Sequence, residues 1–457
     1  MKHPVARAQS HVHTFFRHPT ASQLLIQWFV GLILVGTVLL AMPFSHAQGA
    51  VSVLDALFTS TSAVCVTGLV TVDTGTDYTL AGQWIILTLI QLGGIGILTF
   101  LALAIRAMGR RMDLQSKVAV EDSLYQGNVA AQFTDNFRRI VKVVALIELA
   151  GALALFVALV PGHGVGHSLY SAIFHSISAF CNAGFSVYSD SLEGLRGNPL
   201  FLITIMTLIF MGGIGHAVLG EVAIAAKRRW TNRRTVGAPH RFSLNAKIAL
   251  KVSAGLIVLG ALLIGLSGTT SGDPVERASD ALFQSVSART AGFNSVPVGQ
   301  LPLGSLFVLI VLMFIGGSPG SCAGGIKTTT LAVWWARFRA TFRGDFRAVL
   351  GKRYIPEEIG RKVTMLIGLA LTWNLLGVLV LSWTENATLS QVLFEQVSAF
   401  GTVGLSTGLT PELSVLGKLW IILTMFVGRL GPVTIAMSSV KVSRARVQYA
   451  EGRVMIG

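Results

Sequence analysis

The chain has little charge, and acidic residues are its scarcer charged group. Charged residues make up 12% of its 457 positions, with 21 Asp and Glu against 36 Lys and Arg. Soluble domains carry about 25% charged residues, so this composition excludes an ordinary soluble domain. The mean hydropathy of +0.66 agrees and indicates a protein that resides in lipid.

Cysteine is almost absent, and so are clusters of metal-ligating side chains. The three cysteines, Cys65, Cys181 and Cys322, lie far apart and show no metal-ligand spacing. We therefore expect no disulfide and no cofactor, and packing is the ordinary role for each thiol. No His/Asp/Glu or Cys/His grouping supports a membrane enzyme.

Long apolar runs dominate the remainder of the chain. Eight of them are long enough to cross a membrane, which takes about 20 helical residues. Their approximate ranges are 23–42, 80–105, 137–160, 199–222, 246–266, 302–334 (interrupted), 363–383 and 414–437. The polar, basic stretch before the first run does not resemble a cleavable signal peptide. The sequence thus predicts an all-α polytopic membrane protein.

The net charge of +15 is unevenly distributed. Lys and Arg gather in 106–142, 227–251 and 327–362, whereas the other connections hold mainly Asp and Glu. Basic loops stay in the cytoplasm, so both termini, 1–22 and 441–457, are expected there and the acidic loops outside. Contact with anionic membrane lipids explains the basic excess better than nucleic acid does. An acidic outer face would also concentrate cations.

Four segments of the chain resemble one another. They read LDALFTSTSAVCVTGLVT, YSAIFHSISAFCNAGFSV, SDALFQSVSARTAGFNSV and SQVLFEQVSAFGTVGLST. Each has a phenylalanine, then a Ser-Ala pair and then a glycine, and the third is one residue shorter before its glycine. The recurring residues are Phe58, Phe174, Phe283 and Phe394, then Ser62, Ser178, Ser287 and Ser398, then Gly68, Gly184, Gly292 and Gly404.

A second glycine-containing pattern follows each of these glycines by 24 to 28 residues. It reads QLGGIG, FMGGIG, FIGGSPG and FVGRLG. Two patterns in register across four copies indicate an internal repeat, each copy being a helix, a short pore segment and a helix. We place the copies at 23–136, 137–245, 246–362 and 363–440.

Each pore segment is too short to cross the bilayer twice as helix, so it must enter from outside and return as extended chain. Non-helical backbone at that depth is tolerated only where it is buried in protein or lines water. Four such segments around one axis would form a central pore, with the negative C-terminal ends of four short helices pointing at its centre. Asp55 and Asp280, near the starts of two short helices, would complement the opposite ends.

Carbonyl oxygens of the return segments can replace the hydration shell of a cation such as K⁺. Glycine permits the backbone conformations and the close approach that this requires. Ordinary packing of membrane helices is a serious rival for any single glycine but not for four in register. The residues expected to form this filter are Val64, Cys65, Val66, Thr67, Gly68, Cys181, Asn182, Ala183, Gly184, Thr290, Ala291, Gly292, Gly401, Thr402, Val403 and Gly404.

The sixth apolar run contains GGSPGSCAGGIKTTT, which is unusual inside a crossing. A phosphate-binding loop needs G-x-x-x-x-G-K-[ST] after a strand. Here Ile326 separates Gly325 from Lys327 and the setting is an apolar helix, so we reject that reading. Pro319 lacks the amide proton that a helix needs, and each glycine lowers helix propensity by about 1 kcal/mol. The helix should break into a loop at 316–330.

Such a loop is costly in lipid, so we expect it to cross the pore beneath the filter, where it can obstruct ions. Arg429 replaces a glycine in the second pattern of the fourth copy. A buried arginine costs about 3 kcal/mol unless carbonyls accept its protons, and the broken helix offers them; snorkelling is the alternative. The predicted gate comprises Gly316, Gly317, Ser318, Pro319, Gly320, Ser321, Cys322, Ala323, Gly324, Gly325, Lys327 and Arg429.

Four other ionisable residues lie in or near apolar segments. Arg289 and Glu395, in consecutive pore segments, either pair to brace the filter or remain separate surface charges. Glu148 is expected to make an interhelical hydrogen bond, and His216 to be a core histidine.

Of the eight apolar runs, only the sixth is expected to be strongly broken.

The motifs SAVCVTG, SAFCNAG, SARTAGF and SAFGTVG, with the glycine-rich break in the sixth run, resemble those of the Trk/Ktr/HKT superfamily of potassium transporters. The resemblance covers nearly the whole chain, and a single crossing precedes the first motif, as in the KtrB type. It maps the family's filter glycines onto Gly68, Gly184, Gly292 and Gly404. Glycine at all four goes with potassium preference, although these loops are not the TVGYG of potassium channels, so selectivity should be looser.

The resemblance implies potassium uptake by a homodimer in the bacterial inner membrane, seated on a ring of nucleotide-binding regulatory subunits of the KtrA type. It also implies that the glycine-rich loop is an intramembrane gate and that Na⁺ acts as a coupled (symported) ion or as an activator, although no sodium site is evident. The basic segments 227–251 and 327–362 fit a dock for the regulator and contact with lipid equally well. A sodium-permeating relative and an alternating-access carrier remain rivals; carriers usually show inverted or paired repeats with broken helices in both halves.

Overall fold

The computed structural model describes residues 21–47, 49–107, 133–162, 164–230, 242–268, 273–345 and 347–431. The expected cytoplasmic ends at 1–22 and 441–457 lie outside these ranges, apart from residues 21 and 22, and so does most of the basic stretch 106–142.

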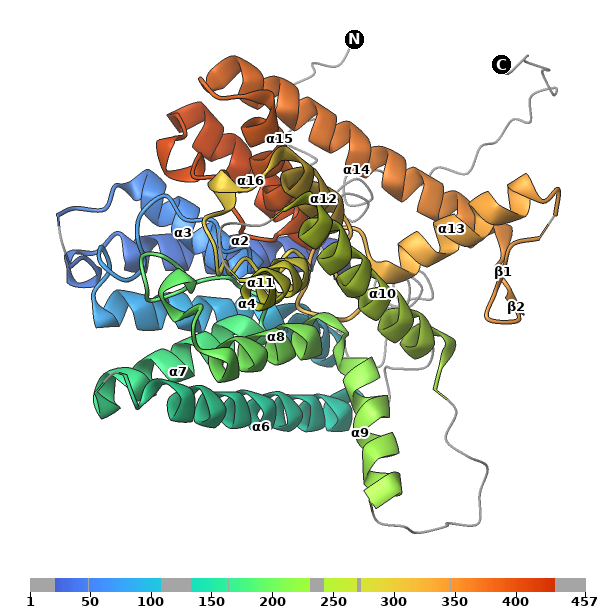
Figure 1. The fold of residues 1–457 in the computed structure, drawn as a ribbon, viewed down its shortest axis with the longest axis horizontal. Coiled ribbons are helices and arrows are strands. Elements are labelled where there is room, and N and C mark those ends of the chain that lie inside the picture. The colour runs from blue at the N-terminus through green and yellow to red at the C-terminus, as the bar shows by residue number, and fades with distance from the viewer. Residues whose placement is uncertain are drawn as a thin grey trace.

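Helices make up most of the described structure, and there is almost no sheet in it (Figure 1). They are α2 (Ala21–Leu40), α3 (Val53–Cys65), α4 (Leu80–Ala107), α6 (Phe133–Leu159), α7 (Val165–Phe180), α8 (Pro199–Gly213), α9 (His216–Trp230), α10 (Leu244–Ser267), α11 (Pro274–Ser287), α12 (Leu303–Phe314), α13 (Thr328–Phe342), α14 (Glu357–Thr384), α15 (Leu389–Gly401) and α16 (Val415–Leu430). Short 3₁₀ turns are η1 (Pro43–Ser45), η2 (Glu193–Leu195), η3 (Val298–Gln300) and η4 (Thr410–Glu412). Between α13 and α14, β1 (Val349–Leu350) and β2 (Arg353–Tyr354) form an antiparallel hairpin. The predicted all-α class is confirmed.

Within the described ranges, four helices are long and apolar enough to span a membrane, and they lie in α2, α6, α10 and α14. α8 and α9 would form a fifth span, but they meet at an angle of 111°. The prediction of one continuous crossing at 199–222 is therefore wrong, as is the expectation of a single strongly broken run. The bend has a local cause: Gly215 has φ +92°, and the His216 amide donates to the Gly320 carbonyl at 3.1 Å instead of to its own helix.

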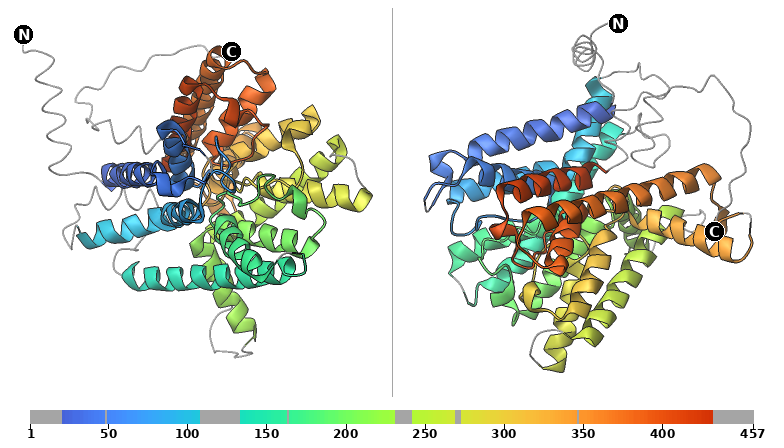
Figure 2. Two further views of the ribbon diagram at one scale, coloured as in Figure 1. Left: turned by 90° about the vertical axis from the view of Figure 1, so that its left-hand side faces the viewer. Right: turned by 90° about the horizontal axis from the view of Figure 1, so that it is seen from above.

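The helices form four groups, each with a short helix between two flanking ones: α2–α3–α4, α6–α7–α8, α10–α11–α12 and α14–α15–α16. In every group the three helices contact one another. The last helix of each group also packs on the short helix of the next, α4 on α7, α8 on α11, α12 on α15, and α16 back on α3. The groups therefore close into a ring, and the left view of Figure 2 shows their blue, green, yellow and red ribbons around a common centre.

The recurring phenylalanines lie in the interior of these groups. Phe58, Phe174, Phe283 and Phe394 are each 0% exposed. In a membrane such a side chain contributes through close van der Waals packing and not through removal from water, so each short helix has an equivalent packing contact within its group.

A serine of the short helix donates a hydrogen bond to the first helix in three of the groups. The pairs are Ser60 with the Ile33 carbonyl, Ser176 with Glu148 and Ser285 with Ile257, at 2.8, 2.6 and 2.8 Å. A glycine of the first helix lies against each serine, at Gly36, Gly151 and Gly260, where a Cβ would collide with the hydroxyl. In the fourth group Gly377 lies against Gln396. Small residues let membrane helices approach closely, so these glycines bring each short helix within bonding distance.

Short polar residues begin four of the helices. The side chains of Ser52, Asn198, Ser243 and Ser414 accept hydrogen bonds from the amide three residues later, at the starts of α3, α8, α10 and α16. N-caps of this kind contribute about 1 kcal/mol each, and they define where each of these helices starts.

Replacing Gly260 with valine should destabilise the protein, because the new side chain would collide with Ser285 and Leu312 where α10 meets its group. Overpacking of this kind costs about 1–3 kcal/mol, which thermal unfolding in detergent would register as a lower midpoint. Gly255→Val is the matched control, since Gly255 is exposed on the same helix and a Cβ there meets nothing within 4 Å. Equal midpoints for the two variants would contradict this account of the contact.

Candidate ion pathway at the centre of the ring

Each short helix ends at the centre of the ring in a turn with left-handed backbone. At the end of α3, the Thr67 amide donates to Ser62 and the Val66 amide to Ala63, which is the Schellman pattern of helix termination. The same pair of bonds closes α7 and α15, whereas the shorter third copy closes with Ala291 donating to Ser287. A non-glycine residue has positive φ in every copy: Val66 at 57°, Asn182 at 58°, Thr290 at 73° and Thr402 at 49°.

A non-glycine residue with the strained left-handed backbone occurs at the equivalent place in all four turns. A non-glycine residue with positive φ costs about 1–3 kcal/mol and persists only where its surroundings enforce it. Two positions later comes the glycine of each motif, also with positive φ: Gly68 at 92°, Gly184 at 70°, Gly292 at 80° and Gly404 at 96°. Extended chain alternates the direction of its carbonyls, and left-handed residues at every second position reverse that alternation. The turns can therefore direct successive carbonyls to one side.

The four glycines lie next to one another. A Cβ on Gly68 would collide with the Ala183 carbonyl, on Gly184 with Ala291, on Gly292 with Val403 and on Gly404 with Thr67. Each of these Cβ positions is also 3.0–3.1 Å from the Cα of the next glycine. The contacts run from the first turn to the fourth and back to the first, so the four turns surround one axis, and only glycine fits at these positions.

The serines of the Ser-Ala pairs hold the turns in place. Ser62 and Ser398 accept hydrogen bonds from the amides of Gly68 and Gly404, at 3.0 and 3.2 Å. Ser178 and Ser287 instead donate to the carbonyls of Phe185, at 2.8 Å, and Phe293. All four serines are 0% exposed, so every turn is attached to its own helix by a buried bond.

The predicted filter residues are brought together, but they do not all share one conformation. Val64 and Cys65 still belong to α3, and Gly401 to α15. The expected extended chain thus begins later than predicted in these two copies. Of the sixteen residues, only Gly184 and Gly404 are half-buried, and the others are buried.

The acidic residues expected to face outward mostly serve structural contacts. Asp55 lies in the first turn of α3, as expected, and accepts from Lys418 at 2.7 Å. Asp280 lies two turns into α11, so its predicted place near the helix start is wrong; it accepts from Arg196 at 2.5 and 3.2 Å. In the turn η2, burial raises the pKa of Glu193 above its ordinary value.

Arg289 and Glu395 do not pair, and neither is a surface charge. Arg289 is 5% exposed and donates to the carbonyls of Ile315 and Gly316 at 2.9 and 2.8 Å. Glu395 is fully buried and accepts hydrogen bonds from Ser406, Thr407 and Thr410 just beyond the fourth turn. Each therefore braces a different segment, and both readings offered by the sequence are wrong.

The glycine-rich stretch of the sixth run is a loop, as expected. Its non-helical part runs from 315 to 327, because Thr328 already begins α13. On one side Ser318 and Cys322 donate their amides to Gly213 and Gly212 of the second group, at 2.9 and 3.4 Å. On the other, Gly324 lies against Thr402 and Gly401 of the fourth turn. The loop thus crosses the centre of the ring directly against the turns.

Arg429 is buried against this loop. Its guanidinium donates to the Cys322 carbonyl through Nη1 and to the Gly93 carbonyl through Nη2, the latter at 2.7 Å. The side chain is 5% exposed, so it does not snorkel to a surface. Lys327 donates to Ala323 within the loop. Arg429 therefore links the loop to the first and fourth groups.

The second glycine pattern is explained by contacts at the ends of the short helices. Cβ atoms on Gly93, Gly212 and Gly428 would collide with the carbonyls of Val64, Phe180 and Phe400. In the third group, Gly316 lies instead against the Gly324 carbonyl of the loop. Glycine at these places lets the last helix of each group pass close behind the helix end.

Glu148 and His216 are both satisfied in the interior. The Gln91 side chain of α4 donates to both carboxylate oxygens of Glu148 in α6, each at 3.1 Å, which confirms the expected interhelical hydrogen bond. His216 is 8% exposed, a core histidine as predicted, and its Nδ1 donates to the Gly320 carbonyl at 2.7 Å. The histidine thereby holds the loop, a role that its sequence position did not indicate.

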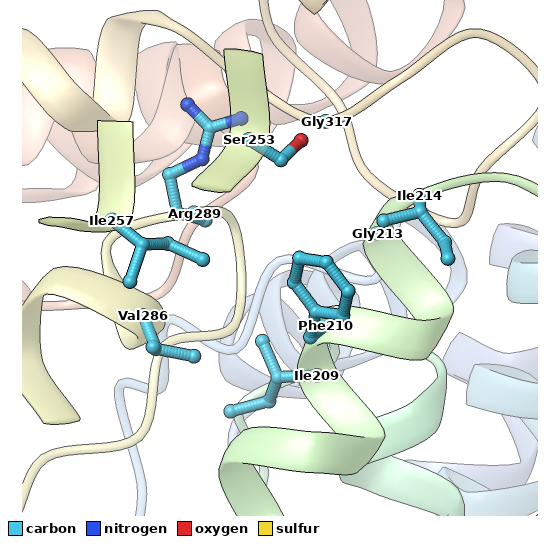
Figure 3. Close-up of a pocket in the computed structure, with 9 residues that line it drawn as sticks. All are labelled: Ile209, Phe210, Gly213, Ile214, Ser253, Ile257, Val286, Arg289 and Gly317. Atoms are coloured by element: carbon cyan, nitrogen blue, oxygen red, sulfur yellow. The ribbon is translucent and has the colours of Figure 1, made fainter. Parts of the chain in front are cut away.

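A mainly apolar cavity lies beside the loop, between α8, α10 and α11 (Figure 3). The cavity itself amounts to about 20 Å³, which is room for about one water molecule. Its lining is Ile209, Phe210, Gly213, Ile214, Ser253, Ile257, Val286, Arg289 and Gly317. Because Gly317 belongs to the loop and Arg289 binds it, the loop borders unoccupied space on this side.

Curated relatives resemble this chain over nearly its whole length. The Ktr system potassium uptake protein B of Bacillus subtilis is 38% identical over 448 residues, covering 96% of this chain and 97% of the relative. The protein of the same name from Vibrio alginolyticus is 37% identical, with 94% and 93% covered. The potassium/sodium uptake protein NtpJ of Enterococcus hirae is 35% identical, with 95% and 97% covered.

A solved structure has the same fold. The potassium transporter TrkH from Vibrio parahaemolyticus matches with a TM-score of 0.73 at 19% identity, covering 93% of this chain and 86% of that one. The TrkH family, described as cation transport protein, matches residues 2–447. Its long apolar helices and its similarity to these transporters make the chain a membrane protein and not an enzyme. It belongs to the TrkH family of cation transport proteins.

Proposed function

We propose that this chain is the ion-translocating subunit of a potassium uptake system, in which K⁺ passes the four glycine turns and a glycine-rich loop gates its path. The observation that carries this proposal is the ring of turns, where the carbonyl of one copy fills the Cβ position of its neighbour's glycine. The names of the relatives support potassium as the ion. The name of NtpJ includes sodium, so sodium permeation is the alternative to test.

The filter works by replacing water around the ion. The carbonyls of Thr67, Ala183, Ala291 and Val403 precede the four glycines and lie at the contacts between turns. Rings of carbonyls substitute for the hydration shell of a cation. The C-terminal ends of α3, α7, α11 and α15 add about half a negative charge each. Because dipoles and not carboxylates hold the ion, binding is weak enough to release it.

The loop 315–327 acts as the gate. It lies against the fourth turn and is bonded to the second group, to Arg289 and to Arg429. Two buried guanidinium groups beside the path also repel an arriving cation. Opening requires the bonds of Arg429 to Cys322 and of His216 to Gly320 to break, and the small cavity beside Gly317 is where the loop can begin to shift.

We further propose a homodimer in the inner membrane, with both termini in the cytoplasm and four pseudo-symmetric repeats in each chain. Two relatives are named for a Ktr system, which supports regulation by separate nucleotide-binding subunits of the KtrA type. Basic residues at the end of α13, Arg337, Arg339 and its C-cap Arg343, support a cytoplasmic position for this end under the positive-inside rule. The same residues suit contact with anionic lipid or with the regulator. Sodium stimulates uptake in this proposal.

Replacing Gly404 with alanine should reduce potassium uptake by at least about tenfold, because displacing a carbonyl from the ring costs more than about 1.4 kcal/mol. Growth of a bacterium lacking its own potassium uptake systems at low K⁺, and Rb⁺ uptake in competition with Na⁺, measure rate and selectivity. Gly408→Ala is the matched control: its φ of +98° resembles the +96° of Gly404, but a Cβ there meets nothing within 4 Å. If both variants lose uptake equally, backbone strain and not the ring explains the loss.

Replacing Arg429 with alanine should increase Rb⁺ uptake several-fold, since the loop loses its bond at Cys322 and the path loses a positive charge. Deletion of Ala323 and Gly324, which shortens the loop, should have the same direction of effect. Arg361→Ala serves as control, because Arg361 is exposed on α14 and, among the described residues, pairs with Glu357 alone. Uptake at or below the wild-type rate in both test variants, at equal amounts of protein in the membrane, would exclude the gate.

Replacing Ser253 with leucine should slow uptake, because the larger side chain fills the cavity into which the loop moves. We expect a several-fold lower rate at saturating K⁺ with little change in apparent affinity, since the filter is untouched. Ala254→Leu, on the exposed face of the same helix, controls for added bulk. An unchanged or faster rate in Ser253→Leu would show that the loop does not open toward this cavity.

A further inference from the structure

Two of the three cysteines meet where the loop reaches the second turn. Cys181 directly follows α7, and Cys322 lies in the loop. A single point, the Cβ position of Gly94, is 2.9 Å from the Cys181 sulfur and 3.8 Å from the Cys322 sulfur. Both side chains are 0% exposed, so the two sulfurs border the same buried spot beside Gly94. The pair thus joins the candidate filter to the candidate gate.

The surroundings of this pair are polar, unlike those of an ordinary packed cysteine. The Cys181 thiol donates to the Gln91 side chain at 3.3 Å. The imidazole of His216 bonds the Gly320 carbonyl, two residues before Cys322, and its Nε2 has no hydrogen-bond partner among the described residues. The guanidinium of Arg429 binds the Cys322 carbonyl. A buried nitrogen without a partner is costly, and here it belongs to a side chain that holds the same loop as Cys322.

We propose that Cys181 and Cys322 form a binding site for a monovalent thiophilic cation, Ag⁺ or Cu⁺. Soft ions of this kind select thiolate ligands and accept two of them in a linear arrangement. Zinc in structural sites takes four ligands. In the described parts of the chain, no group of three or more His, Cys, Asp or Glu residues could hold a metal ion. Two thiols without a third ligand therefore fit the monovalent soft ions.

The binding step is a proton exchange without electron transfer. Ag⁺ replaces the two thiol protons, which pass to water, one of them by way of the free Nε2 of His216. Metal binding to thiols releases protons in this way. The resulting bis-thiolate complex carries one negative charge, and the adjacent guanidinium of Arg429 offsets it. The site is thus balanced in charge despite its burial.

Occupation of the site would fasten the loop to the second turn. A monovalent cation small enough for the filter would reach the site by the same route as K⁺. Soft cations should therefore close the path from within. This consequence rests on the proposed function, whereas binding of the ion does not.

Binding is tested on the purified full-length protein in detergent, incubated with excess Ag⁺, separated by gel filtration and analysed for silver per chain by mass spectrometry. We expect a single retained Ag⁺ in the wild type and in Cys65→Ser, and affinity lower by at least about tenfold in Cys181→Ser and in Cys322→Ser. Serine keeps the size of cysteine, and thermal midpoints verify folding; Cys322→Ala provides a second loop variant. Equal retention in all variants, or loss confined to Cys65→Ser, would overturn the proposal.

The effect on transport is tested separately in proteoliposomes, with Rb⁺ uptake of each variant expressed relative to its own rate without Ag⁺. Inhibition should be strong in the wild type and in Cys65→Ser, and at least about tenfold weaker in Cys322→Ser. Undiminished inhibition in Cys322→Ser would overturn the fastening of the loop. Retained silver in a protein without any Rb⁺ uptake would support the site and count against the proposed function, so the two failures are distinguishable.

Discussion

Carbonyl oxygens of one turn occupy the space that a side chain of the neighbouring turn's glycine would fill. This close approach of four backbones is the constraint to which the rest of the structure conforms. The short helices must stop before the axis, so they end in left-handed caps at residues such as Val66 and Thr402. Strained caps persist only where the surrounding structure fixes them. Here the buried phenylalanines, the hydrogen bonds of the serines and the close packing at the flanking glycines fix them.

The features that the sequence predicted are those that one residue type alone can satisfy. Three such features can be predicted from the sequence alone: the glycines at Gly68 and Gly404, the helix break around Pro319 and the buried arginine at position 429. The serines that bind the first helices were visible too: Ser60, Ser176 and Ser285 each stand two residues before a Ser-Ala pair. That recurrence does not by itself predict a hydrogen bond, because a serine in a membrane helix has many ordinary roles.

The features that could not be predicted depend on residues far apart in the chain. The bend between α8 and α9 is stabilised by Gly320, which accepts from the amide and the ring of His216. Arg289 turns away from Glu395 because the carbonyls of Ile315 and Gly316 are exposed by the broken helix α12. Asp280 lies inside its helix, where Arg196 of another group reaches it. Periodicity and composition do not indicate which distant residues become such partners.

At the loop, buried arginines and buried carbonyls that would each be unfavourable alone stabilise one another. A buried arginine without partners costs about 3 kcal/mol in a membrane interior, and each buried carbonyl without a donor costs about 1–3 kcal/mol. Arg289 and Arg429 together supply donors to the carbonyls of residues 315, 316, 322 and 93, which reduces both deficits, although the buried Nε of Arg429 has no partner among the described residues. The same arrangement places two positive charges beside the axis. The two guanidinium groups that stabilise the broken helix in the membrane are therefore also the groups that repel a cation. In the proposed mechanism the closed state needs no further element. When the loop opens, water must hydrate both the guanidinium groups and the carbonyls that they leave.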